Sequence, residues 1–163
     1  MVEEKILITL DTNVLQEFWK DREKKDIVEK LISLSKIDQI DLAVTARVRE
    51  DIPNEPLSKK INELREINIS ETGSFTRLDY WVLNRDQLAC KEFADFFNNF
   101  ENDSEIKNSP DWRDIDHLHA HYLQKRDIFL TWDKGILYFK DILNKKFGLT
   151  IQKPEDFIKV YFE

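Results

Sequence analysis

Four acidic side chains are placed where they could do chemistry instead of packing a core. Asp11 directly follows an apolar run, and Asp133 follows another one closely. Asp114 lies where a helical pattern begins, and Asp51 comes six residues after the apolar run that ends at Thr45. Positions at the ends of helices and strands carry functional groups more often than core positions do. These acids are therefore the first candidates for an active site.

The chemistry that such acids could share is cation binding. If the apolar runs are parallel strands, their carboxyl ends meet at one edge of a sheet, which is where ligands bind in open α/β folds. Several carboxylates at that edge would repel one another and raise one another's pKa unless a cation neutralised them. Hard oxygen ligands favour Mg²⁺ or Mn²⁺ over zinc. Such a cation can activate water and stabilise the phosphate of an in-line displacement.

Each acid also has a purely structural alternative. Asp11 and Asp133 could each cap a following helix, which is worth about 1 kcal/mol. Asp114 and Asp116 could be first-turn acids that the helix dipole favours. These alternatives explain the acids one at a time, whereas a shared cation site explains why all of them occur at comparable places.

The histidines offer a rival chemistry. His117 and His121 are four residues apart on a predicted helix and so share one face, as metal-binding histidine pairs do. However, Leu118 stands where a zinc hydrolase would carry its glutamate base. We therefore interpret His117 as a supporting residue near the acids, where it could pack or bind phosphate.

Apolar periodicity gives the elements that must position these residues. Strands are predicted at 6–10, 40–45, 128–131 and 149–151, with a further short strand near 67–69. Helices are predicted at 14–19, 27–34, 57–66, 136–147 and 154–160. A further helix carries Asp114 in its first turn. An aromatic helix is predicted near 88–100, and we interpret its aromatic face as part of the core. Alternating strands and helices predict an α/β fold with a parallel sheet.

Length and composition limit the class of protein. A chain of 163 residues fits one domain, with a less regular, enlarged region at about 70–108. The single cysteine, Cys90, allows no internal disulfide and is predicted to be a buried thiol.

No apolar segment reaches membrane-spanning length, and the N-terminal segment does not resemble a signal peptide, so we expect a soluble cytoplasmic protein without a membrane partner. A net charge of −7 does not indicate nucleic-acid binding, although it does not exclude it.

Four segments of the sequence resemble the PIN domain family of VapC-like metal-dependent ribonucleases. They are residues 11–15, 44–52, 114–120 and 129–134, in the family's order and spacing over nearly the whole chain. The resemblance implies a three-layer α/β/α sandwich with a central, mainly parallel sheet. It also implies a Mg²⁺- or Mn²⁺-dependent endoribonuclease that acts on RNA and frequently forms a homodimer. Many bacterial members are toxins that pair with an antitoxin protein.

The resemblance assigns roles to individual residues. The catalytic acids would be Asp11, Asp51, Asp114 and Asp133, of which Asp11, Asp114 and Asp133 are the predicted metal ligands. For the second acid the family usually has glutamate, so Glu50 is the alternative to Asp51; we favour Asp51 because of its distance from Thr45. The predicted supporting residues are Asn13, Thr131, Glu50, Asp116 and His117.

Two functions from different classes follow. The first is a ribonuclease that uses the four acids to hydrolyse a phosphodiester bond. The alternative is a catalytically inactive PIN-like module that binds RNA or a protein, through the basic clusters or the aromatic region at 75–100. The presence of acids at all four places favours the enzyme.

Overall fold

The computed structural model describes residues 5–51, 57–72, 92–93, 95–96 and 112–163. Five parallel strands form one sheet in the order β3-β2-β1-β4-β5. The strands are β1 (Ile6–Leu10), β2 (Ile40–Thr45), β3 (Ile69–Thr72), β4 (Ile128–Leu130) and β5 (Thr150–Gln152). The helices are α1 (Thr12–Trp19), α2 (Lys25–Lys36), α3 (Val48–Asp51), α4 (Leu57–Glu66), α6 (Trp112–Leu123), α7 (Lys134–Phe147) and α8 (Pro154–Phe162).

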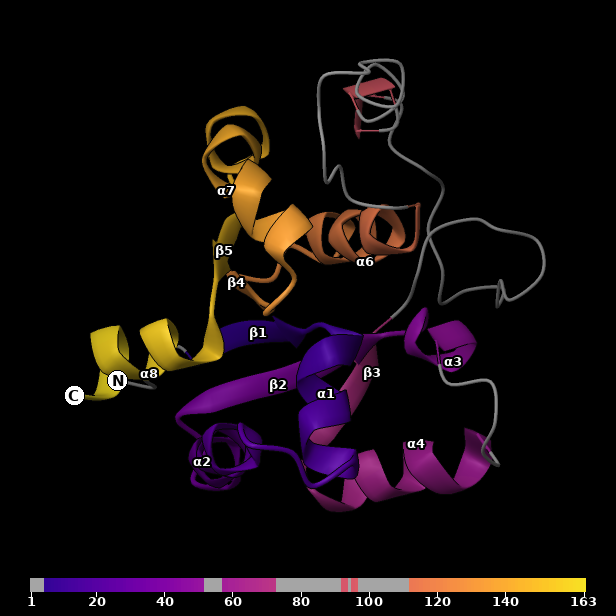
Figure 1. The fold of residues 1–163 in the computed structure, drawn as a ribbon, viewed down its shortest axis with the longest axis vertical. Coiled ribbons are helices and arrows are strands. Elements are labelled where there is room, and N and C mark those ends of the chain that lie inside the picture. Colours follow the sequence, from indigo (N-terminus) through magenta and orange to yellow (C-terminus); the bar gives the residue numbers. More distant parts are fainter. Residues whose placement is uncertain (1–4, 52–56, 73–91, 94, 97–111) are drawn as a thin grey trace.

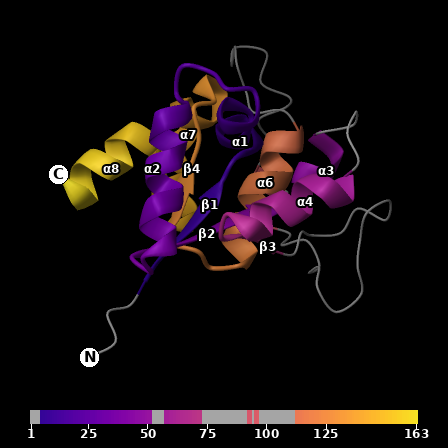
Figure 2. The same ribbon diagram turned by 90° about the horizontal axis from the view of Figure 1, so that it is seen from below.

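Helices cover both faces of the sheet, so the predicted three-layer α/β/α architecture is confirmed. Helices α6 and α7 lie on one face, and α1, α2, α4 and α8 lie on the other (Figures 1 and 2). Strands that are buried on both faces need apolar side chains on both faces. This explains why β1, β2 and β4 appear in the sequence as almost continuous apolar runs.

The two faces of the sheet have separate cores, and alternate strand residues enter them. In β4, Ile128 and Leu130 pack in the core under α1 and α2, whereas Phe129 packs in the core under α6 and α7. Phe93 and Phe96 are also buried in this second core. The expected core role of the aromatic segment is thus confirmed for these two residues, while Cys90 and the remainder of that segment lie outside the described residues.

The sheet register places three polar residues side by side at the carboxyl edge. Leu10 is paired with Val44 on one side and with Leu130 on the other. The next residue of each strand is therefore Asp11, Thr45 or Thr131. The same register confirms that β1 ends directly before Asp11, as the sequence pattern predicted.

The third strand differs from its predicted position. It begins at Ile69 and not at 67, because Asn68 adopts a left-handed conformation with φ of 66° and turns the chain between α4 and β3. The Asn68 side chain donates to the backbone oxygen and the hydroxyl of Ser35, at 3.0 and 2.8 Å. These contacts hold the turn against the end of α2.

The remaining helix boundaries follow the expected signals. Gly148 ends α7 with φ of 70°, and Pro154 occupies the first turn of α8. Within the part of the chain that the structure describes, no helix has the length and apolar character needed to cross a membrane.

Candidate functional site

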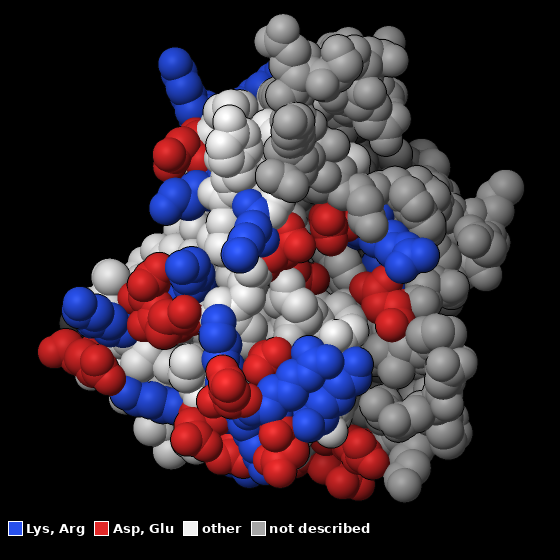
Figure 3. All heavy atoms as spheres, viewed as in Figure 1, with Lys and Arg blue, Asp and Glu red and all other residues white. Residues whose placement is uncertain are grey.

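A polar cavity of about 230 Å³ lies at the carboxyl edge of the sheet. All four predicted acids line it, together with five other residues: Asp11, Asp51, Asp114 and Asp133 with Thr12, Asn13, Gln16, Arg113 and His117. In the space-filling view, acidic atoms gather in a hollow of the surface with basic atoms close beside them (Figure 3). The fold thus brings together residues that are more than a hundred positions apart in the chain.

Asp11 is the most firmly held of these acids. One carboxylate oxygen accepts the Thr12 amide at 2.7 Å, so Asp11 caps α1 as well as lining the cavity. The other oxygen accepts the Asn13 side-chain amide at 2.8 Å and the Thr131 hydroxyl at 2.6 Å. Asn13 and Thr131, predicted as supporting residues, therefore orient this carboxylate directly.

The electrostatic position of Asp11 is unfavourable without a cation. Burial raises the pKa of Asp11 above its ordinary value, and the charge of Asp133 adds to this effect. The charge of His117 and the hydrogen bonds from Thr131 and Thr12 act in the opposite direction without cancelling it. A cation in the cavity would favour the ionised form.

Asp51 is held from two sides. Its Oδ2 atom accepts the Thr12 hydroxyl at 2.7 Å and lies 2.7 Å from Nε2 of His117. Its Oδ1 atom is buried and lies 3.6 Å from Nε of Arg47. Burial opposes its ionisation, but the hydrogen bond and the charge of His117, with Thr12 and Arg47, hold the pKa of Asp51 below its ordinary value. Asp51 is therefore a carboxylate with positive groups around it.

His117 connects several parts of the site. Its Nδ1 lies 2.6 Å from the Thr45 hydroxyl, and its Nε2 also approaches the Thr12 hydroxyl at 3.2 Å. Burial opposes protonation, but the hydrogen bond to Asp51 and the charges of Asp11, Asp51 and Asp114 raise the pKa of His117 above its ordinary value. The interpretation of His117 as a supporting residue near the acids agrees with these contacts.

Asp116, predicted as a supporting residue, does not line the cavity. It is 1% exposed, and its carboxylate lies 3.6 Å from Nη1 of Arg47. Arg47 also approaches Asp51, so its guanidinium connects Asp116 to an acid of the cavity. Asp51 lines the cavity, and Glu50 lies in α3 with its side chain outside the described residues.

Asp133 caps α7, as its structural alternative anticipated. Its Oδ1 atom accepts the Ile136 amide at 2.9 Å, and its own amide donates to the Thr131 hydroxyl at 2.9 Å. Thr131 is thus bonded to both Asp11 and Asp133. Capping and lining the cavity are compatible, because a carboxylate has more lone pairs than one cap uses.

The other two histidines point away from the acids. His119 stacks on Phe93 with ring centroids 4.5 Å apart, and burial lowers its pKa to about 4. Nδ1 of His121 lies 2.8 Å from the Thr9 hydroxyl, and burial, with the charge of Arg126, lowers its pKa to about 3. His117 and His121 therefore do not form a common zinc site.

The donor set suits a hard cation, although it is not a closed cage. Asp11, Asp114 and Asp133 bring carboxylate oxygens to one cavity, and Asn13 supports Asp11 through its side-chain amide. Among the described residues, no three histidine, cysteine or acidic side chains are arranged as a ready metal centre. Mg²⁺ commonly uses only one or two carboxylates and keeps several waters, so an open arrangement fits this ion better than it fits structural zinc.

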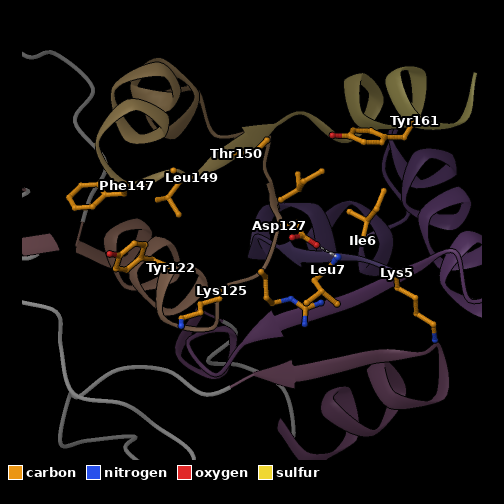
Figure 4. A pocket seen from close by; sticks show the side chains of 13 residues that line it. Lys5, Ile6, Leu7, Tyr122, Lys125, Asp127, Phe147, Leu149, Thr150 and Tyr161 are labelled. Carbon is orange, nitrogen blue, oxygen red and sulfur yellow. Dashed lines mark hydrogen bonds between the residues drawn. The ribbon is translucent and has the colours of Figure 1, made fainter. Parts of the chain in front are cut away.

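A second, larger cavity lies at the opposite edge of the sheet (Figure 4). Its volume is about 1010 Å³, and among the described residues its lining mixes aromatic and basic side chains with one carboxylate, that of Asp127. This carboxylate accepts the Leu7 amide at 2.7 Å (Figure 4). It therefore holds the start of β1 in place and is a structural group.

Sequence reasoning did not assign roles to Thr12, Thr45 or Arg47. Thr12 and Thr45 are buried polar residues at a helix start and a strand end, and Arg47 is only 4% exposed. For Thr45 the available signal was its position as a polar residue at the carboxyl end of a predicted strand. For Arg47 the available signal was its i,i+4 spacing from Asp51, whereas its second partner, Asp116, is distant in sequence.

Comparison with known proteins gives no relative: no protein-family model matches the chain, and no curated protein matches its sequence.

Proposed function

We propose that this protein is a metal-dependent endoribonuclease that hydrolyses RNA phosphodiester bonds with Mg²⁺ or Mn²⁺. The observation that carries the proposal is the convergence of Asp11, Asp51, Asp114 and Asp133 on one cavity at the carboxyl edge of a parallel sheet. Asp11, Asp114 and Asp133 would hold the cation. When bound, it would activate a water molecule and stabilise charge on the phosphate.

The protein's own residues prepare this site. Thr131 and Asn13 fix the carboxylate of Asp11, so that it does not reorganise when a cation arrives. Thr12 and His117 fix Asp51 on the other side of the cavity. Arg113 lies at the cavity and would supply positive charge for a substrate phosphate.

The direct test is cleavage of a single-stranded RNA with and without Mn²⁺. We expect metal-dependent cleavage by the wild type and its loss in Asp11→Asn. Asp141→Asn is a matched control, because Asp141 is an exposed acid on α7 outside the cavity. Cleavage that survives Asp11→Asn, or that does not depend on metal, would contradict the proposal.

One observation favours a second candidate, an inactive PIN-like module that binds RNA or a protein. Asp51 is already neutralised by His117 and Arg47, an arrangement that stabilises the fold without a cation. This candidate predicts RNA binding without cleavage, and binding that is unchanged by Asp11→Asn. An electrophoretic mobility assay run beside the cleavage assay separates the two.

The biological part of the proposal is a cytoplasmic toxin that pairs with an antitoxin protein or forms a homodimer. Two exposed apolar side chains, Tyr138 and Ile142, lie one turn apart on α7 and offer a contact surface. Light scattering of the purified chain, alone and co-expressed with the product of the adjacent reading frame, tests both partners. A monomer in both experiments would contradict this part only.

A further inference from the structure

We propose that His117 is a positioning residue: it fixes the Asp51 carboxylate relative to Asp114, so that Asp51 faces the cation that Asp11, Asp114 and Asp133 would hold. The proposal rests on the proposed function, because it concerns the same metal site.

Both ring nitrogens of His117 are used, and each reaches a different part of the fold. Nδ1 lies 2.6 Å from the Thr45 hydroxyl at the end of β2, and Nε2 lies 2.7 Å from Oδ2 of Asp51 on α3. Thr45 is fully buried, so it holds the ring from inside the sheet. An imidazole that is bonded at both nitrogens has one orientation available.

A hydrogen bond from His117 links Asp51 to another element of the site. The structure describes α3 from Val48 to Asp51, so Asp51 is the last described residue of this helix. Helix α6 is three turns long, and it carries Asp114 one turn before His117. The hydrogen bond from His117 therefore ties α3 to the helix that carries another acid of the site.

The donors on Asp51 are placed to set the plane of its carboxylate. Oδ2 accepts both the Thr12 hydroxyl and His117, while Oδ1 accepts no hydrogen bond from the described residues. Thr12 begins α1 directly after Asp11. His117 and Thr12 thus connect Asp51 to both of the elements that carry Asp11 and Asp114. Partners that orient metal-site carboxylates typically contribute 10–100-fold to metal affinity or activity.

His121 provides a matched control on the same helix. It is also buried, and it also contacts a strand threonine, with its Nδ1 2.8 Å from the Thr9 hydroxyl. Within the described residues its hydrogen bond goes to no carboxylate. Substitutions of His121 therefore report the structural cost of losing a buried histidine from α6.

Two substitutions of His117 separate its two contacts. An asparagine amide reaches about as far as Nδ1, and a glutamine amide about as far as Nε2. His117→Gln keeps a donor for Asp51, whereas His117→Asn keeps only the contact to Thr45. Mn²⁺ affinity of the RNA-free protein, measured by electron paramagnetic resonance, is the primary readout. Cleavage kinetics and the thermal midpoint are measured beside it.

We expect His117→Asn to weaken Mn²⁺ binding about 10–100-fold and His117→Gln to restore most of this loss. His121→Asn and His121→Gln lower the thermal midpoint and leave Mn²⁺ affinity unchanged. In an Asp51→Asn background, His117→Asn adds no further loss of affinity, because the two residues act as one unit.

Equal Mn²⁺ affinities in His117→Asn, His117→Gln and the wild type would overturn the positioning role while leaving the nuclease proposal intact. A wild type that neither binds Mn²⁺ nor cleaves RNA would overturn both. If a His117 variant fails to fold, Thr45→Val carries the test, because it removes the support of the ring and leaves His117 and Asp51 in place. Thr45→Val must then weaken Mn²⁺ binding in the otherwise wild-type protein. It must cause no further loss of Mn²⁺ affinity in the Asp51→Asn background.

Discussion

The cavities at the two edges of the parallel sheet differ in volume and in the side chains that line them, and these two differences point in opposite directions. The amino edge has the larger cavity, about 1010 Å³, and the carboxyl edge has one of about 230 Å³. Yet four carboxylates line the smaller cavity, whereas the carboxylate that the described residues bring to the larger one, that of Asp127, holds the start of β1. Convergent polar groups therefore mark the candidate active site, and the size of a hollow does not.

The difference has a cause in the fold. Strands of a parallel sheet all end at one edge, where loops lead into helix starts. Asp11 and Asp133 cap α1 and α7 at that edge, so capping residues and site residues coincide. At the amino edge the chain enters the strands from helix ends, and basic side chains such as Lys125 accompany the turns.

The largest expected effect comes from removing metal. Chelation with EDTA should abolish RNA cleavage, and Mn²⁺ should restore it, because Asp11, Asp114 and Asp133 cannot stabilise phosphate charge by themselves. Substitution of Lys125 by alanine, at the amino edge, should leave cleavage unchanged. Cleavage that persists in EDTA would contradict the assignment of a cation-dependent site to the carboxyl edge of the sheet.

Thr131→Val should reduce cleavage by about 10–100-fold. The substitution keeps the shape of the side chain but removes the hydroxyl that donates to Asp11 at 2.6 Å and accepts from the Asp133 amide at 2.9 Å. Steady-state kinetics at saturating and limiting Mn²⁺ measure the effect. As a control, Thr150→Val changes an equivalent threonine at the amino-edge cavity, and a loss of the same size there would count against a special role for Thr131.

Arg47→Met should lower the free energy of unfolding by about 3–5 kcal/mol, because it removes the guanidinium that lies 3.6 Å from the buried carboxylate of Asp116. Urea denaturation measures this loss. Adding Asp116→Asn to Arg47→Met should recover part of it, since the second substitution removes the buried charge that Arg47 had faced. Full additivity of the two substitutions would show that the pair does not interact.

The smallest effect concerns pH and separates the histidines of α6. The pKa values of His119 and His121 are lowered to about 4 and about 3, so between pH 6.5 and these values the unfolded chain binds protons that the folded chain does not. Stability therefore falls as pH falls below 6.5, by at most about 1.4 kcal/mol per pH unit for each group. The raised pKa of His117 has the opposite sign: its contribution is complete below 6.5 and is lost as pH rises through the folded-state value.

His121→Asn is the matching experiment for this pH effect. Denaturation at pH 7 and pH 5 should show a smaller acid-induced loss of stability in the variant than in the wild type. An equal loss in both proteins would mean that His121 is not the group that titrates.

The sequence was sufficient for the fold and for the placement of the acids. Apolar runs that end in Asp11 and near Asp133 indicate buried parallel strands, and parallel strands have only one carboxyl edge. Asp51 lines the cavity as predicted, while the choice between Asp51 and Glu50 stays a prediction that rests on the turn of about 100° per residue along a helix. The offset of β3 could not be read from the apolar pattern, since it depends on the left-handed conformation of Asn68.

The connections among the acids were not predictable in the same way. Thr12 and His117 meet at Asp51 from 39 and 66 positions away, and Arg47 joins Asp51, four positions along, to the distant Asp116. Such contacts depend on how α3 and α6 pack beside β2. Local patterns carry no information about that packing.

The assignment of the cation site is tested most sharply by a titration of Mn²⁺ into the RNA-free protein, followed by electron paramagnetic resonance, for the wild type and for Asp11→Asn. We expect saturable binding to the wild type, and a loss of that binding of about 100-fold or more in Asp11→Asn. Equal binding to both proteins, or none to the wild type, would contradict the assignment of the carboxyl-edge acids as a cation site.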